Sequence, residues 1–246
     1  MLDAHCHISF KKFNSDREEV IARAASVGIS MVDSAVSVYT ALRSLELSSI
    51  YDNIYTSIGV HPYRAPSVPR DIIEGIKKIA SGGDIVAVGE IGLDYHLKHK
   101  SEKQESVFRE FLSLALELSL PAVIHCRDAE KEAFEILLEL DVEKALFHCY
   151  SGSISLAERI LEGGYSISLA TNLCYSKHHR KLAESLPLKS IILETDSPYL
   201  SPVKQIKRNE PAFIEESVKV IEEIKGEDNK KIKKSTKRNT GRFYAI

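Results

Sequence analysis

Hydrophobic positions along this chain change their spacing in a regular alternation. Short continuous apolar runs are typical of strands buried on both faces of a parallel sheet, and they alternate with stretches in which apolar residues recur every three or four positions, as on one face of a helix. The alternation repeats eight times and predicts a parallel sheet covered by helices. The expected strands are residues 2–8, 31–38, 54–60, 84–90, 121–125, 145–148, 165–170 and 190–194.

Start and stop signals bracket several of the expected helices. Ser15 and Glu18 have the spacing of a capping box, and Gly28 is placed to end the helix that follows them. Pro211 is suited to the first turn of a later helix. The helical pattern is weakest between the seventh and eighth strands.

Eight strand–helix units in 246 residues fit an α/β fold of the TIM (β/α)₈ barrel type, formed as a single domain over residues 1–246. A doubly wound open sheet would carry a glycine-rich phosphate loop after its first strand, but His5-Cys6-His7 stands there instead. The Lys-rich segment 230–242 is expected to form a short amphipathic helix that closes the barrel bottom rather than a nucleic-acid tail, because Ile232, Phe243 and Tyr244 need a place to pack.

Composition agrees with an ordinary globular protein, since hydrophobic residues make up 43% and charged residues 28% of the chain. We find no basic-then-apolar leader and no apolar stretch that approaches 18 residues, so the sequence predicts a cytoplasmic protein without a membrane partner. No obligatory protein partner is evident. The formal net charge of −2 means that attraction to an anionic substrate must come from local clusters.

The four cysteines form neither a Cys-x-x-Cys pair nor a secretory framework, and they are interpreted as reduced thiols. Cys6, Cys126 and Cys149 each directly follow a histidine at a strand end. If those histidines face the barrel interior, the thiols face the apolar layer under the helices and serve packing rather than catalysis.

Polar residues gather where a barrel of this kind carries its chemistry. His5 and His7 share one face of the first strand, and two imidazoles on one face are suited to a borderline divalent metal. Active sites of such barrels lie at the carboxyl ends of the strands. Further histidines and carboxylates follow the other apolar runs at those ends: His61, Glu90, His125, His148 and Asp196. Separate pairing of so many polar groups inside the core is implausible, so the pattern predicts a shared metal site.

With these residues in view, the sequence resembles the TatD-type metal-dependent hydrolases within the amidohydrolase-like superfamily. The resemblance runs along the whole chain in six ordered blocks: Asp3-Ala4-His5-Cys6-His7, Gly59-Val60-His61-Pro62, Gly89-Glu90-Ile91-Gly92-Leu93-Asp94-Tyr95, His125-Cys126-Arg127-Asp128-Ala129, Phe147-His148-Cys149-Tyr150-Ser151-Gly152 and Glu194-Thr195-Asp196-Ser197-Pro198.

The resemblance implies two divalent ions and an activity. His5, His7, Glu90 and Asp196 would hold one ion, while Glu90, His125 and His148 would hold a second, with Glu90 bridging the two. The implied activity is metal-dependent hydrolysis of DNA, single-stranded or nicked, with 3′→5′ exonuclease action on single strands.

Physical chemistry agrees with these implied roles. Two metals about 3.5–4 Å apart can generate a hydroxide near neutral pH and hold both oxygens of a phosphodiester displacement. Asp196 could orient the water and accept its proton, and Arg127, on the strand face of His125, could clamp a phosphate. His61, Asp94 and Tyr95 are placed to line the pocket rim as substrate-binding residues, although each could instead fix a neighbouring group or loop.

Basic residues in the loops around the expected mouth suit a polyanion, or they are ordinary solvated loop charge. They are Lys98, Lys100, Lys103, Lys177, Arg180, Lys181, Lys204, Lys207 and Arg208. Arg208 is the candidate phosphate contact among them. The Arg208-Asn209-Glu210-Pro211 segment lacks the glycine usually found just before it in the family, which puts nuclease specificity in doubt more than metal binding. His178 and His179 are expected on the surface.

Other functions remain open at this point. The same centre could hydrolyse a small amide, lactone or ester, or remove a D-amino acid from mischarged tRNA, and a metal-loaded binding scaffold without catalysis is a third possibility. The metal is also open, because four imidazoles with two carboxylates suit Zn²⁺, while phosphodiester cleavage often uses Mg²⁺ or Mn²⁺.

Overall fold

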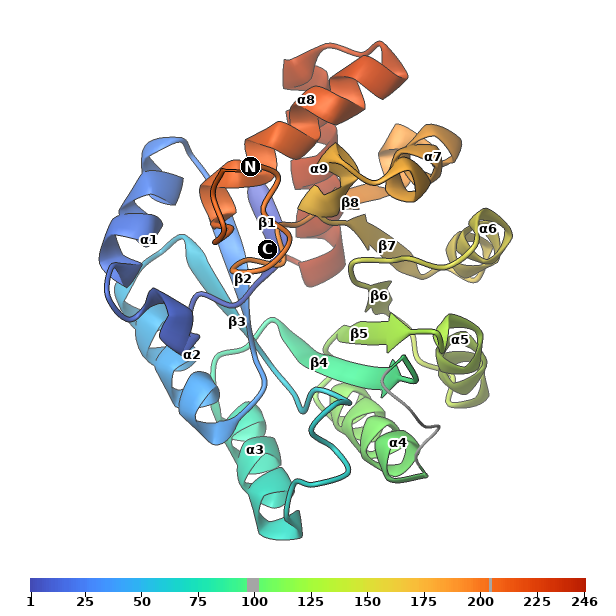
Figure 1. Cartoon of the computed structure of the whole chain (residues 1–246). Helices are drawn as coiled ribbons and strands as arrows, with labels where there is room; N and C mark the ends of the chain where they lie inside the picture. Colours follow the sequence, from blue (N-terminus) through green and yellow to red (C-terminus); the bar gives the residue numbers. More distant parts are fainter. Residues whose placement is uncertain (97–101, 204) are drawn as a thin grey trace.

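A computed structural model describes residues 1–96, 102–203 and 205–246. Its sheet has eight parallel strands in sequence order, so each strand pairs with the next along the chain (Figure 1). This arrangement confirms the predicted (β/α)₈ barrel. The strands are β1 (Leu2–Cys6), β2 (Ser30–Ala35), β3 (Ile54–Ile58), β4 (Ala87–Asp94), β5 (Ala122–Arg127), β6 (Ala145–Phe147), β7 (Ser166–Leu169) and β8 (Ile191–Leu193).

Helices cover the outside of the barrel, as Figure 1 shows. The α-helices are α1 (Arg17–Ser26), α2 (Val38–Ile50), α3 (Arg70–Gly82), α4 (Glu102–Glu117), α5 (Glu130–Glu139), α6 (Ile154–Glu162), α7 (Lys177–Ser185), α8 (Ile214–Lys225) and α9 (Asn229–Tyr244). Short 3₁₀ helices are η1 (Lys11–Phe13), η2 (Thr171–Cys174), η3 (Leu188–Ser190) and η4 (Pro211–Phe213). In the ranges described, no helix is both long enough and apolar enough to cross a membrane.

The two ends of the sheet meet just beyond β1 and β8. The backbone N–H of Asp196 donates to the carbonyl of His5 at 2.9 Å, and the N–H of His7 donates to the carbonyl of Ser197 at 2.7 Å. These bonds place the first and the last metal-site candidates of the sequence side by side at the carboxyl end of the barrel.

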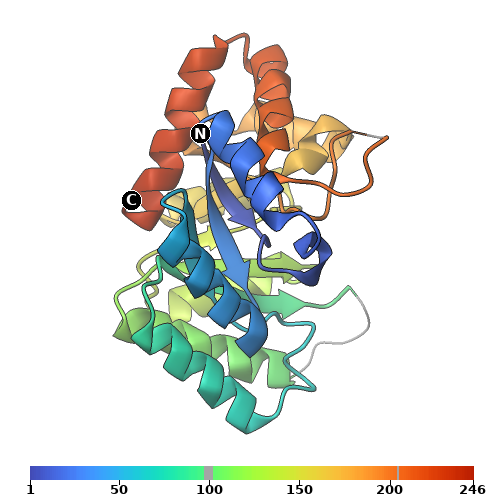
Figure 2. The same ribbon diagram turned by 90° about the vertical axis from the view of Figure 1, so that its left-hand side faces the viewer.

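The amino end of the barrel is closed by the C-terminal helix. Phe243 and Tyr244 of α9 pack against a cluster of interior residues near the strand starts, and the Tyr244 hydroxyl donates to the carbonyl of Ala4 at 2.7 Å. The cluster consists of Ala4, Val32, Ala87, Val123, Leu146 and Ile192. Figure 2 shows α9, which ends at the C-terminus, on the side of the barrel away from the carboxyl end of β4. The predicted closing helix is therefore confirmed, although at 16 residues it is not short.

The predicted capping box at Ser15 and Glu18 is wrong. Helix α1 begins at Arg17 with Asp16 as N-cap, and no side chain caps its amino end. The Asp16 carboxylate instead accepts two hydrogen bonds from Arg208. Asp16 therefore pairs with a residue distant in sequence and does not cap the helix.

Strand boundaries differ most at β4, which continues to Asp94, four residues beyond the predicted end. Its ladder with β5 includes Gly92 opposite His125. A Cβ at Gly92 would lie 1.9 Å from the His125 carbonyl oxygen, so only glycine permits this pairing. Several predicted strands run one to three residues too long at their carboxyl ends, where the apolar run continues into a loop at the mouth.

The weak helical pattern after the seventh strand does form a helix, α7. The Ser176 side chain caps it by accepting a hydrogen bond from the backbone N–H of His179. His179 is buried rather than on the surface, and its Nε2 lies 3.1 Å from the Asn172 side-chain nitrogen, whereas His178 is exposed as expected.

Candidate metal centre

A cavity of about 870 Å³ opens at the carboxyl end of the barrel. Its walls come from loops and strand ends of most of the barrel, which is where the sequence predicts the chemistry to lie. Among its lining residues are the predicted site residues His7, His61, Glu90, Asp94, His125, Arg127, His148 and Asp196. His5 is fully buried directly beneath the cavity.

Strand β1 presents its two histidines in a fixed orientation. The Nδ1 of His7 lies 2.7 Å from the Ser34 carbonyl oxygen, and the Nδ1 of His5 lies 3.1 Å from the Ser34 hydroxyl. Both Nε2 atoms therefore point away from β2 toward the cavity, 3.3 Å from each other. Two buried imidazole nitrogens this close are suited to sharing one cation.

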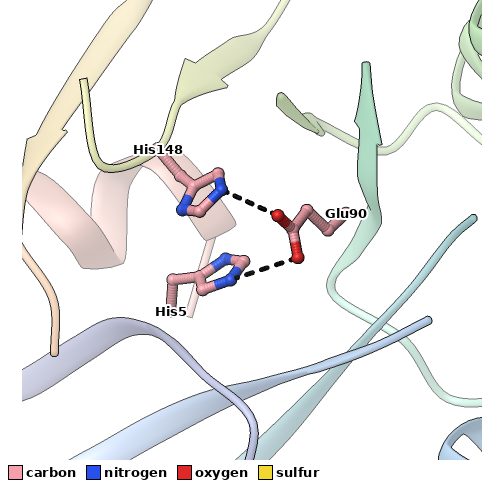
Figure 3. A group of neighbouring side chains, drawn as sticks. All are labelled: His5, Glu90 and His148. Atoms are coloured by element: carbon pink, nitrogen blue, oxygen red, sulfur yellow. Dashed lines mark hydrogen bonds and ion pairs between the residues drawn. The ribbon is translucent and has the colours of Figure 1, made fainter. Parts of the chain in front are cut away.

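Glu90 lies between two groups of histidines, as Figure 3 shows for His5 and His148. Its Oε2 lies 3.6 Å from the Nε2 of both His5 and His7. Its Oε1 lies 2.8 Å from His125 Nδ1 and 2.9 Å from His148 Nε2. Each carboxylate oxygen thus faces a different pair of imidazoles, which is the arrangement expected of a carboxylate that bridges two ions.

The donor set fits divalent cations. Glu90 Oε2 is buried and has no hydrogen-bond partner among the described residues, a costly state for a carboxylate oxygen. Asp196 adds a second carboxylate, with its Oδ1 3.4 Å from His7 Nε2. Three sets of residues each bring ligand atoms within 4.8 Å of one another: His5, His7 and Asp196; His5, Glu90 and His148; and His61, Glu90 and His125.

The electrostatics of the cluster favour positive charge at its centre. Burial by itself would raise the pKa of Glu90, but the charges of His61 and His148 hold that pKa well below its usual value. Burial opposes protonation of His7, yet hydrogen bonding to Asp196 and the charge of Glu90 raise the His7 pKa to about 9. Protons compensate the buried carboxylates here, and divalent ions would take over that role and displace them.

Two carboxylates orient the remaining histidines. Glu194, which is fully buried, lies 3.2 Å from His148 Nδ1, so the His148 Nε2 is turned toward Glu90. Asp94 lies 3.1 Å from His125 Nε2. Asp94, predicted at the pocket rim, lies in the cavity wall against the ligand candidate His125.

Glu194 and Ser34 are functional candidates that sequence reasoning missed. Glu194 lies in one of the six motif blocks, two residues before Asp196. This position in a motif block could have marked it as a candidate site residue. Ser34 carries no such signal, because it lies inside the predicted second strand and not at its carboxyl end.

Arg127 lines the cavity and is exposed. Among the described residues it has no ion pair within 4 Å, so neither Asp128 nor Glu130 holds its guanidinium. Asp128 is paired instead with His96, whose Nδ1 lies 2.9 Å from its carboxylate. The phosphate-clamp role of Arg127 stays a prediction.

Two predicted substrate residues lie elsewhere. Tyr95 is partly buried against the hydrophobic core and does not line the cavity. The Arg208 guanidinium donates to Asp16 and to the Lys12 carbonyl, and it lies 4.7 Å from the centre of the Phe13 ring. Neither side chain lines the cavity, because each finds a partner that is distant in sequence or in the core, and their substrate-binding roles stay predictions.

The basic loop residues do not surround the cavity as a group. In the described part of the chain, the Lys or Arg residues that line the cavity are Arg64 and Arg127. Arg180 is paired with Glu223 at 2.8 Å. Lys103, Lys177, Lys181 and Lys207 do not line it, and Lys98, Lys100 and Lys204 lie outside the described residues.

The cysteines divide between the core and the site. Cys6 is fully buried in the layer under the helices, as predicted. Cys126 belongs to that core and also borders the cavity, while Cys149 lines the cavity with a left-handed backbone at φ 45°, contrary to the prediction. Burial raises the pKa of the Cys149 thiol well above its usual value, so this sulfur is neutral and a poor nucleophile.

A (β/α)₈ barrel that gathers buried imidazoles and carboxylates at the carboxyl ends of its strands defines a metal-dependent hydrolase. Comparison with known proteins assigns the family. Residues 2–245 match the profile of the TatD related DNase family. The chain belongs to this family, and it is a TatD-type metal-dependent hydrolase.

Individual relatives agree with this assignment. An uncharacterized metal-dependent hydrolase of Methanocaldococcus jannaschii is 42% identical, over 99% of this chain and 96% of its own length. A 3′-5′ ssDNA/RNA exonuclease TatD of Citrobacter rodentium is 30% identical, over 100% of this chain and 98% of its own length. The crystal structure of a TatD homologue from Escherichia coli superposes with a TM-score of 0.91 at 28% identity, and covers 100% of this chain and 98% of the other.

Proposed function

We propose that the protein hydrolyses phosphodiester bonds in single-stranded nucleic acid, DNA in the first place, and removes nucleotides from the 3′ end. Support comes from relatives of about the same length that are named 3′-5′ ssDNA/RNA exonucleases. The cavity opens at the carboxyl end of the barrel, and its Lys or Arg lining residues in the described part of the chain are Arg64 and Arg127.

We propose two ion sites that share Glu90. His5, His7 and Asp196 would complete the first, and His125 and His148 the second. Ions bound there would lower the pKa of a water molecule and neutralise charge on the phosphoryl oxygens. The imidazole-rich donor set favours Zn²⁺ over Mg²⁺, which prefers oxygen ligands.

The chain's own residues perform the other parts of the reaction. Asp196 is ionised, because hydrogen bonding and charge from His7 overcome burial and lower its pKa, so it can accept the proton of the attacking water. Its side chain is 17% exposed and borders the cavity. Arg127 binds a phosphate oxygen of the substrate through its guanidinium fork. His61, with Nε2 3.3 Å from Glu90 Oε1, stands beside the second ion site at the cavity wall.

One observation carries the proposal above the others: the two oxygens of Glu90 face separate pairs of histidines. The residues involved come from both ends of the sequence, and we propose that residues 1–246 act as a single domain. A small amide, lactone or ester, and a D-aminoacyl-tRNA, are tested as competing substrates below, because the same centre could act on them.

The test combines metal analysis with turnover. Protein saturated with Zn²⁺, Mn²⁺ or Mg²⁺ is desalted and its metal content measured, and each form is assayed on 3′- and 5′-labelled single strands, duplex DNA, RNA, lactones, esters and D-aminoacyl-tRNA. We expect about two ions per chain and stepwise shortening from the 3′ end of single strands. If the protein hydrolyses lactones or esters but leaves nucleic acid uncleaved, the nuclease proposal is wrong.

A matched variant checks the role of the bridging carboxylate. Glu90→Gln keeps the shape of the side chain and removes its charge, so we expect both ion sites to weaken and turnover to fall by at least about a thousandfold. Full retention of both ions would show that Glu90 does not bridge them.

A further inference from the structure

The charged side chains of α9 are all of one sign. The helix contains seven basic residues and no acidic residue. The rest of the chain then holds 26 basic against 35 acidic side chains, a net charge of −9. A strongly basic face on an otherwise acidic protein is suited to a polyanion.

Four of these cations form a ladder along one side of α9. Lys230, Lys234, Arg238 and Arg242 follow one another at intervals of four residues, and all four are exposed. Like charges at this spacing destabilise a helix by roughly 0.2–0.5 kcal/mol per pair. None of the four takes part in an ion pair within 4 Å among the described residues, whereas Lys231 and Lys233 are paired with Glu227 and Glu215.

Two hollows beside the ladder lack acidic side chains. A cavity of about 530 Å³ is lined by Lys234, Lys237, Arg238 and Arg242 together with Gly241 and Ile246. Arg242 also borders a second cavity of about 260 Å³, whose other cationic residues are Lys144 and Lys189. Cations from α9, from the start of β6 and from η3 therefore converge on one surface, which we call the α9 basic surface.

This surface lies at the opposite end of the barrel from the metal centre. Phe243 and Tyr244 fix α9 beneath the strand starts, while the metal centre lies beyond the strand ends (Figure 2). A substrate held only in the cavity would not reach it. A long strand that continues past the rim could contact both.

We propose that the α9 basic surface binds the phosphate backbone of a nucleic-acid strand outside the active site. The choice of nucleic acid rests on the proposed function, and the anionic character of the ligand rests on the charges alone. A membrane surface fits less well, because an interfacial helix needs an exposed apolar face beside its cations. Ile246 is a single exposed large hydrophobic residue at this cavity, and the buried side of α9 is already occupied by the barrel.

The test uses the full chain with its metal removed by a chelator, so that binding is measured without cleavage. Lys234→Gln/Arg238→Gln/Arg242→Gln removes three charges from the surface. The matched control Lys78→Gln/Lys177→Gln/Lys181→Gln removes three exposed lysines from α3 and α7. Binding of a long fluorescent single strand is followed by anisotropy over a series of salt concentrations.

We expect the α9 variant to bind at least about tenfold more weakly and its salt slope to shrink by about 2, while the control keeps the parent slope. Thermal denaturation midpoints should be unchanged or raised in the α9 variant, because like-charge pairs are removed. Equal losses in both variants, or no loss in either, would overturn the proposal. Tighter binding of the parent to anionic phospholipid vesicles than to the strand would also overturn it.

An activity assay distinguishes failure of this proposal from failure of the proposed function. With metal present, the α9 variant should hydrolyse a trinucleotide like the parent and show a raised KM on a long strand. If the parent cleaves no nucleic acid at all, the proposed function fails, while the metal-free binding comparison still decides the fate of the α9 basic surface.

Discussion

The carboxylate of Glu194 lies 3.2 Å from His148 Nδ1, and this contact fixes which nitrogen of His148 faces Glu90. Ser168 donates a hydrogen bond to the other Glu194 oxygen, so the carboxylate is itself held in place. A histidine oriented in this way keeps its free nitrogen ready for a cation.

Replacing Glu194 by Gln tests that orientation. We expect metal affinity at the His148 site to fall by about 10–100-fold, because the amide cannot hold the imidazole with the same charge. Competition with a chromophoric chelator measures the affinity. A variant that binds both ions as tightly as the parent would show that Glu194 supports only the core.

Replacing His5 and His7 together by Ala should remove mainly one ion, because His125, His148 and Glu90 remain. We expect about one ion per chain by elemental analysis of the folded protein. Loss of both ions with an unchanged circular dichroism spectrum would mean that the division of ligands between the two sites is wrong.

Arg127→Lys should cripple phosphodiester cleavage without changing metal content. Lysine keeps the charge but loses the planar fork that matches phosphate oxygens. We expect a loss of about 2–4 kcal/mol in transition-state stabilisation, visible in kcat as well as KM. Steady-state kinetics on a single strand measure both.

Arg208→Lys is the matched control, since Arg208 is paired with Asp16 and does not line the cavity. We expect it to lower thermal stability modestly and to leave turnover within a few-fold of the parent. If Arg208→Lys abolishes turnover and Arg127→Lys does not, Arg127 is not the phosphate ligand.

Gly92→Ala should damage both fold and site. The backbone at Gly92 has φ 141°, and an added Cβ would lie 1.9 Å from the carbonyl oxygen of His125. We expect a destabilisation of about 3–5 kcal/mol and loss of metal from the His125 site. Gly75→Ala in α3, where the Cβ meets nothing within 4 Å, should instead stabilise by up to about 1 kcal/mol. Urea titration compares the two.

Stability of the metal-free protein should fall as pH rises from about 6.5 to about 9. The His7 pKa is raised to about 9, so its contribution is present below its unfolded value near 6.5 and is lost as pH rises through 9. The pKa shift corresponds to about 3 kcal/mol. Burial and the charge of His148 lower the pKa of His5, which is therefore neutral across this window and does not contribute. Two other groups add to the effect in the same direction. Glu90 and Glu194 raise the pKa of His148 well above its usual value despite its burial, and burial raises the pKa of Asp3 to about 8.

Denaturation with and without metal at each pH measures this effect. In the metal-loaded protein the ions replace the protons, so we expect the stabilisation by metal to grow with pH over the same window. A metal-free protein equally stable at both ends of the window would exclude His7 as a protonated group.

The barrel and the metal-site candidates could be predicted from sequence because both follow local rules. Apolar runs mark the strands, and a histidine or carboxylate at the end of a run is carried to the mouth whatever the neighbouring helices do. Glu90 and His125 were predictable for that reason.

Side chains that find distant partners could not be predicted in the same way. Arg208 pairs with Asp16, a residue 192 positions earlier, and only the folded barrel brings them together. His179 resembles a surface residue in sequence until η2 supplies Asn172 as a partner. The continuation of β4 through Gly92 likewise depends on the close approach of β5, which spacing alone does not reveal.

The bonds that join the ends of β1 and β8 also bear on how the protein is made. The Asp3 carboxylate accepts a hydrogen bond from the backbone N–H of Thr195, across 192 residues, next to the pair of bonds that bring His5 and Asp196 together. During synthesis, the first strand must wait for nearly the whole chain to leave the ribosome before it gains its last neighbour. The nascent chain therefore carries His5 and His7 without Asp196 for most of translation, and hydrolytic competence arrives only with the final strand.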